Sequence, residues 1–95
     1  MAAYVIAQVD VTDTNAYQEY ARLVPGTVAA YGGRYIVRAG RTEAVEGNWE
    51  PKRLVIIEFP DVERARAWYD SEEYREPKAI RHKTATSSLT IVEGA

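Results

Sequence analysis

The 95-residue sequence contains no cysteine and only one histidine. Without cysteine the chain forms no disulfide, offers no thiol nucleophile and holds no metal or iron–sulfur cluster through thiolates. A lone histidine with no neighbouring carboxylate motif, here His82, makes neither a nucleophilic triad nor a metal site. We therefore expect no metal and no cofactor, and the missing cysteine fits a reducing cytoplasm.

An excess of positive charge and a long hydrophobic run are also missing. Twelve Lys and Arg residues against 14 Asp and Glu residues give a net charge of −2, whereas nucleic-acid binding proteins usually have a basic excess. No apolar run approaches the roughly 20 residues that a membrane-spanning helix needs. The N-terminus lacks a positive segment and soon reaches Asp10, unlike a signal peptide. We expect one cytoplasmic domain over residues 1–95, with neither nucleic acid nor membrane as a partner.

The sequence does contain four strand-like segments. The apolar run within residues 53–59 is bounded by two prolines and predicts a central strand. Alternating apolar residues predict strands over 3–11, 34–39 and 87–92. Gly40 suggests a bend or bulge, after which 41–45 would continue the second strand into a long hairpin closed by the loop 46–52.

Helical periodicity fills the intervals between these strands. A cluster of short polar residues at 12–14 predicts a helix start, and apolar residues then recur at helical spacing to about Tyr31, where Gly32 and Gly33 end the helix. Asp61 caps a second helix, and a third over 72–83 begins with a capping box between Asp70 and Glu73. Because proline removes a backbone donor, we expect a kink or break at Pro25 and a division of the last helix at Pro77.

The order β-α-β-β-α-β predicts an α+β fold of the ferredoxin-like type, an antiparallel sheet with helices on one face. Parity along the strands assigns these residues to the helix-covered face: Val5, Ala7, Val9, Tyr35, Val37, Val55, Ile57, Leu89 and Ile91. The open face then carries Tyr4, Ile6, Gln8, Ile36, Arg38, Leu54, Ile56, Glu58, Ser88 and Thr90. This second face is too apolar to stand in water, so we expect a second copy of the chain to cover it and form a homodimer.

Three blocks of sequence resemble a bacterial family known as domain of unknown function 1330. They are YGGRYIVRAG at 31–40, EGNWEPKRLVIIEFPD at 46–61 and WYDSEEYREPKAIR at 68–81, and the resemblance spans nearly the whole chain. It implies a ferredoxin-like protomer that pairs into a dimeric α/β barrel, a shape similar to that of small monooxygenases, muconolactone isomerases, haem-handling enzymes and ligand-sensing domains. The family has no settled activity, so the resemblance assigns no catalytic residue. Pro77 departs from relatives whose helix continues unbroken.

One candidate site lies at the polar end of the open face, formed by Gln8, Arg38, Glu58 and Thr90. Polar side chains on otherwise apolar strands are costly unless they are paired. As a site, Arg38 would hold a carboxylate or enolate while Glu58 moves a proton. The alternative is a structural Arg38–Glu58 ion pair, which is satisfied within one chain or crosses the dimer interface.

A second candidate is an aromatic and basic cluster in the last two helices, formed by Trp68, Tyr69, Tyr74, Lys78, Arg81 and His82. It would line a pocket mouth for a flat acidic ligand, with His82 as acid or base. Alternatively, Trp68 and Tyr69 are core residues and Lys78 and Arg81 belong to a solvated helix face. The tyrosines of the first helix, Tyr17, Tyr20 and Tyr31, have the spacing of core residues.

Two functions follow as hypotheses. In the first, the homodimer binds a small anionic or aromatic molecule in a cavity beside the sheet, and any chemistry there is cofactor-independent proton transfer or oxygenation. In the second, the chain is a non-catalytic interaction or sensing module that uses its dimer surface and Trp49, an aromatic residue in a polar loop. No motif in the sequence decides whether the protein is an enzyme.

Overall fold

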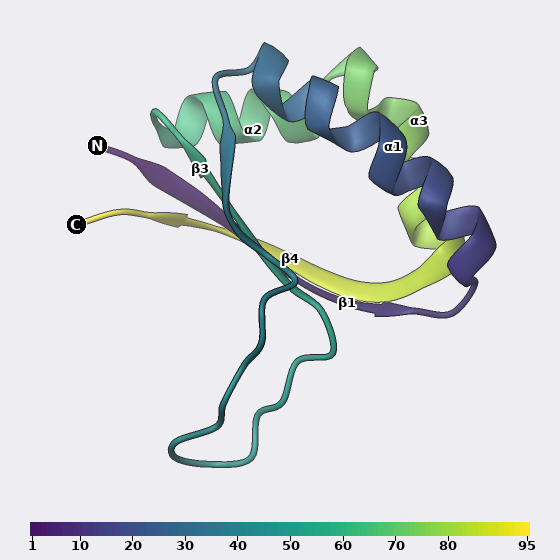
Figure 1. Cartoon of the computed structure of the whole chain (residues 1–95). Helices are drawn as coiled ribbons and strands as arrows, with labels where there is room; N and C mark the ends of the chain where they lie inside the picture. Colours follow the sequence, from purple (N-terminus) through teal and green to yellow (C-terminus); the bar gives the residue numbers. More distant parts are fainter.

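A computed structural model describes all 95 residues. They form one sheet with helices covering one of its faces (Figure 1). The elements in chain order are β1 (Ala3–Val11), α1 (Thr14–Ala30), β2 (Arg34–Arg38), β3 (Leu54–Phe59), α2 (Val62–Tyr69), α3 (Glu72–Thr84) and β4 (Ala85–Glu93). The sheet has the order β2-β3-β1-β4, and all neighbouring strands are antiparallel. The predicted α+β, ferredoxin-like fold is confirmed, although β4 is longer at both ends than residues 87–92.

Short polar side chains begin each helix. The Asp13 carboxylate accepts a hydrogen bond from the Ala16 backbone N–H at the start of α1, and Asp61 accepts one from Arg64 at the start of α2. At α3 the hydroxyl of Ser71 accepts from the backbone N–H of Tyr74 at 3.1 Å. The predicted capping box between Asp70 and Glu73 is therefore wrong, since Asp70 is the C-cap residue that follows α2 and Ser71 caps α3.

Neither proline interrupts its helix. Pro25 lies inside α1 and Pro77 inside α3, and both helices run continuously past them. A break at Pro25 and the predicted division at Pro77 are therefore wrong, whereas the kink that was the alternative at Pro25 stays a prediction. Each proline removes one backbone hydrogen bond, whereas the packing of an apolar helix face supplies most of the stability of a helix in a protein. Pro77 is itself buried.

Strand β2 is short and irregular. Its register with β3 passes from Tyr35 opposite Ile57 directly to Val37 opposite Ile56, so Ile36 is an extra residue in a β-bulge. The bulge thus lies at Ile36 and not at Gly40. It moves Val37 to the open face and Arg38, opposite Val55, to the helix-covered face, which reverses the prediction for both residues.

Residues 39–53 form a loop in place of the predicted hairpin extension over 41–45. Ala39 has a left-handed backbone with φ of 59°, which ends the strand. The loop extends from the sheet on the side away from the helices (Figure 1). It joins β2 to β3 without regular structure. Arg38 lies directly before the loop, and Arg53 is its last residue.

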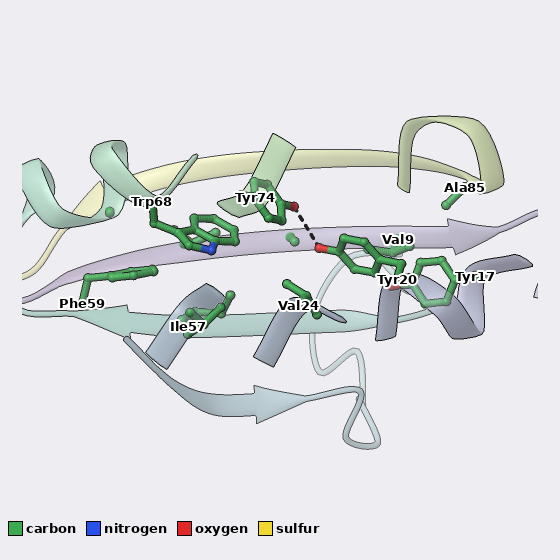
Figure 2. Close-up of a cluster of buried hydrophobic side chains, with 13 residues drawn as sticks. Val9, Tyr17, Tyr20, Val24, Ile57, Phe59, Trp68, Tyr74 and Ala85 are labelled. Atoms are coloured by element: carbon green, nitrogen blue, oxygen red, sulfur yellow. Dashed lines mark hydrogen bonds between the residues drawn. The ribbon is translucent and has the colours of Figure 1, made fainter. Parts of the chain in front are cut away.

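The core lies between the sheet and the helices. Figure 2 shows Phe59, Trp68, Tyr74, Tyr20 and Tyr17 in a row along the helix-covered face of the sheet. Two polar pairs are enclosed there. The Trp68 indole N–H donates to Thr27 Oγ1 at 3.0 Å, and the hydroxyls of Tyr20 and Tyr74 are 2.9 Å apart. Trp68 and the first-helix tyrosines Tyr17 and Tyr20 are therefore core residues.

No helix in the structure has both the length and the apolar character needed to span a membrane.

Candidate functional site

A small cavity of about 30 Å³ lies between the helix-covered face of the sheet and α1. Ala7 and Val9 of β1 belong to its lining, and the small side chain of Ala7 leaves room above the strand. Tyr17 and Tyr20 reach the cavity from α1. The full lining is Val5, Ala7, Val9, Tyr17, Tyr20, Ala21, Val24, Tyr35, Arg38, Arg53, Val55, Ile57, Arg81 and Leu89. It contains three guanidinium groups and no carboxylate.

Arg81 is the most unusual of these residues, because its side chain is buried without an acidic partner. Only 3% of the residue is exposed. Its Nη1 donates to Ser87 Oγ at 2.7 Å and its Nη2 lies 3.2 Å from His82 Nε2, while its Nε is buried with no hydrogen-bond partner. A buried charge that lacks a counter-charge and a full set of hydrogen bonds is strongly unfavourable.

Arg53 and Arg38 bring two further positive charges to the same cavity. The guanidinium carbon of Arg53 lies 5.7 Å from the centre of the Tyr17 ring, and that of Arg38 lies 4.6 Å from the Tyr35 ring. These cation–π contacts give partial compensation. The Nε of Arg53 is nevertheless buried without a partner. The cavity is thus electropositive as well as largely apolar.

The tyrosines around the cavity do not neutralise this charge. Burial raises the pKa of Tyr35 to about 12, and burial is also the main cause that raises the pKa of Tyr20 and Tyr74. Arg81 opposes this shift at both Tyr20 and Tyr74, but the loss of solvation outweighs it. At neutral pH these phenols are therefore uncharged. Neither an anion nor a base is available among them.

The first predicted cluster is not assembled. Glu58 lies on the open face, where its carboxylate accepts from Arg34 Nε at 2.6 Å and from the Tyr4 hydroxyl at 3.4 Å. The predicted Arg38–Glu58 ion pair is wrong because the bulge at Ile36 turns Arg38 to the other face. Thr90 is on the open face opposite Ile6.

Gln8 is also on the open face but lies four residues along β1 from the strand position opposite Glu58, which is about 13 Å in an extended strand. Its side-chain oxygen accepts from the Trp49 indole N–H at 2.6 Å. The aromatic residue of the loop therefore contacts the open face of its own sheet, although 59% of Trp49 remains exposed.

The residues of the second predicted cluster lie in three different places, namely the core, the surface and the cavity lining. Trp68 and Tyr74 are buried in the core and do not line a pocket mouth. Lys78 donates to the backbone oxygen of Tyr69 at 3.0 Å and covers its ring. Arg81 is not on a solvated helix face, because α3 passes directly into β4 at this end and encloses the side chain.

His82 is an exposed residue outside the cavity lining. Loss of solvation, followed by the charges of Arg81 and Lys78, lowers the pKa of its imidazole. Since a guanidinium only donates hydrogen bonds, Nε2 of His82 accepts from Arg81 and the ring is neutral in this contact. His82 thus lies at the surface and holds one end of the buried Arg81 guanidinium by this hydrogen bond.

Of the predicted ligand-binding residues, Arg38 and Arg81 line the cavity, whereas Gln8, Glu58, Trp68, Tyr69 and Tyr74 do not. Arg53 was missed. Its position two residues before Val55 gives it the parity of the helix-covered face, and this signal was present in the sequence. The cavity role of Tyr35 follows from the same parity.

Comparison with known proteins fits this fold. The model of a family described as a domain of unknown function (DUF1330) matches residues 2–95. The chain belongs to this family. This confirms the family resemblance that was expected from the three sequence blocks. No curated protein matches it in sequence.

Solved structures similar to the DUF1330 protein share its fold at low sequence identity. A protein of unknown function from Rhodopseudomonas palustris has 18% identity and a TM-score of 0.78, with 99% of this chain and 82% of that chain covered. A dimeric ferredoxin-like protein of unknown function from Jannaschia sp. has 11% identity and a TM-score of 0.73, with 99% and 100% covered. SnoaB, a cofactor-independent oxygenase from Streptomyces nogalater, has 10% identity and a TM-score of 0.69, with 99% and 93% covered.

Proposed function

We propose that the DUF1330 protein binds a small organic anion in the cavity between its sheet and α1, with Arg81 as the main contact. The observation that carries this proposal is the buried Arg81 side chain, whose Nε has no partner and whose cavity contains no carboxylate. A bound anion would supply the missing counter-charge and acceptor, and charge-assisted hydrogen bonds of this kind are about twice as strong as neutral ones.

The remaining lining indicates the body of the ligand. Most of the cavity surface comes from aliphatic side chains of the sheet and from tyrosine rings of α1 and β2. A compact aromatic or aliphatic group matches such a surface in polarity, with one acidic group facing Arg81. Because about 30 Å³ holds only about two water molecules, such a ligand must displace lining side chains as it enters. Arg53 and Arg38 also line the cavity, and we expect them to make further contacts with the anion.

The proposed function is ligand binding, and no side chain of the protein acts as a base in it. Glu58 lies on the opposite face of the sheet and His82 is outside the lining, so neither receives a catalytic role here. The likeness to SnoaB is a likeness of fold, and it does not transfer oxygenase chemistry to this cavity.

We further propose that a second copy covers the open face of the sheet. Ile36 of β2 and Val92 of β4 are 45% and 42% exposed, and Val37, Ile56 and Ile6 form an apolar row across β2, β3 and β1. Structurally similar proteins from Jannaschia sp., Thermobifida fusca and Bacteroides fragilis are described as dimeric. A homodimer is the simplest way to bury such a face.

Replacing Arg81 with methionine tests the anion site. Because the change removes a buried, uncompensated charge while keeping a long apolar side chain, the ligand-free variant should be as stable as the wild type or more stable, by up to about 4 kcal/mol. The wild type should gain thermal stability on titration with benzoate and related aromatic carboxylates, and Arg81→Met should lose this response. Denaturant melts and thermal-shift titrations measure the two effects.

Arg75→Met is the matched control, since Arg75 is an exposed residue on the same helix with only a surface contact to Glu72. It should leave the carboxylate response unchanged. Strong destabilisation by Arg81→Met, together with a wild type that responds to none of the carboxylates, would mean that Arg81 is only a structural residue.

A further inference from the structure

We infer that the cavity also takes weak oxygen acids, namely phenols and enols, and that it holds them as their conjugate bases at a pH where they are neutral in water. The inference rests on the proposed anion site and extends it from carboxylates to ligands that change their ionisation on binding. The groups that carry it are the three guanidiniums of Arg38, Arg53 and Arg81 and the absence of any acidic side chain in the lining.

The hydrogen-bonding capacity of the lining favours an ionised ligand oxygen. Two buried guanidinium N–H groups, the Nε of Arg53 and of Arg81, lack an acceptor. A phenolate or enolate oxygen accepts several hydrogen bonds and carries the counter-charge that these groups need. A neutral hydroxyl also accepts but leaves the buried charge of Arg81 uncompensated.

The proton of a neutral ligand finds few acceptors among the lining side chains. Arginine offers none, the hydroxyl of Tyr20 is already paired with that of Tyr74 at 2.9 Å, and the hydroxyls of Tyr17 and Tyr35 are the ones that remain. The carbonyls of Val5 and Ala7 belong to a strand that is paired on both sides. The lining has no carboxylate or imidazole that would take a hydrogen bond from the ligand.

The ionisation needs no protein base. The ligand's O–H bond breaks in solution, water accepts the proton, and the resulting anion enters the cavity with its electron pair directed at the guanidiniums. Preference for the anion then appears as a lower apparent pKa of the bound ligand, and each unit of this shift corresponds to a tenfold preference for the ionised form.

4-Nitrophenol is a direct probe, because its ionised form is yellow and its neutral form is not. With the wild-type protein in saturating excess, the midpoint of the yellow colour should move to lower pH by at least about one unit, which is a tenfold preference. Circular dichroism over the same pH range verifies that the protein stays folded. Arg75→Met should give the wild-type shift, while Arg81→Met and, separately, Arg53→Met should reduce it.

The outcomes separate this inference from the proposed function. Benzoate binding with no binding of 4-nitrophenol, or with a midpoint that is unchanged or moved to higher pH, overturns the inference and leaves the anion site standing. Failure of both benzoate and 4-nitrophenol to bind overturns both. If Arg81→Met does not fold, the wild-type midpoint and the Arg53→Met variant still decide the question.

Discussion

Two buried tyrosines, Tyr20 and Tyr74, and the half-buried Tyr35 connect single side chains to the behaviour of the protein at high pH. The folded state raises the pKa of Tyr35 to about 12 and also raises that of Tyr20 and Tyr74, whereas an unfolded chain ionises tyrosine near pH ~10. The folded protein therefore retains protons that the unfolded chain releases. This contribution is complete below pH ~10 and is lost as the pH rises through about 12.

We expect Tyr35→Phe to lose less stability than the wild type between pH ~10 and ~12, because it no longer carries one of these groups. Denaturant melts at each pH, with tyrosinate absorbance recorded in parallel, measure the effect. Tyr31→Phe is the comparison variant. Tyr31 is partly buried, and its hydrogen bond to Glu73, more than burial, raises its pKa, so this change leaves Tyr20, Tyr35 and Tyr74 in place. Equal pH dependence in Tyr35→Phe and the wild type would contradict the assignment.

Among single residues, the sequence points to two members of the cavity lining for reasons that the structure corrects. It predicts Arg38 and Arg81 as ligand contacts, but with Arg38 beside Glu58 and Arg81 at a pocket mouth. A bulge that displaces one side chain has no compositional signal when the extra residue is an ordinary Ile36. Burial of Arg81 depends on how α3 meets β4, which is a tertiary property.

The turn between α1 and β2 shows how an element boundary depends on close packing. Gly32 has φ of 77°, which favours glycine, and Gly33 lies against the core. A β-carbon at Gly33 would stand 2.7 Å from a ring carbon of Phe59 and 2.8 Å from Val28. The core would have to move to accept it.

Gly33→Ala should therefore destabilise the fold by about 1–3 kcal/mol. Gly26→Ala is the contrasting change, because Gly26 lies within α1 with open space around its position, and it should stabilise the protein by about 0.5–1 kcal/mol. Urea denaturation measures both. Similar effects of the two changes would show that close packing at Gly33 is not what requires glycine there.

Element types and order were predictable because hydrophobic periodicity and capping residues are local signals. The strands over 3–11 and 53–59 and the cap at Asp13 illustrate this. The sequence does not show that both helices continue past Pro25 and Pro77. The cost of a proline is local, whereas the packing that offsets it is a tertiary property. The predicted continuation of β2 over residues 41–45 is wrong for a similar reason. A strand-like sequence forms a strand only where a neighbouring strand pairs with it, and these residues have no such partner.

At the scale of the whole molecule, the open face of the sheet predicts an assembly. Ile56 lies between Ile6 and Val37 in the middle of this face. In a homodimer, Ile56→Lys would bury an unpaired charge, which costs about 3–5 kcal/mol and weakens association more than about a hundredfold. Ala67→Lys, an exposed position on α2, should have no effect on association.

Light scattering and analytical ultracentrifugation at micromolar concentration measure the result. The wild type and Ala67→Lys should have twice the 10.7 kDa mass of one chain, and Ile56→Lys should have the mass of a single chain. A wild type that sediments as a compact monomer would remove the dimer and leave the cavity as a property of one chain.

The single inserted residue in β2 decides on which side of the sheet the following side chains lie. Deleting Ile36 would leave Val37 opposite Ile56 and Arg38 opposite Val55, so the bulge would disappear while both residues kept their faces. Regular pairing with Ile36 retained would instead bring Arg38 to the face that carries Glu58 and take one guanidinium away from the cavity. An alignment that treats Ile36 as an insertion therefore assigns Arg38 to the correct side of the molecule, whereas one that counts it as an ordinary strand position does not.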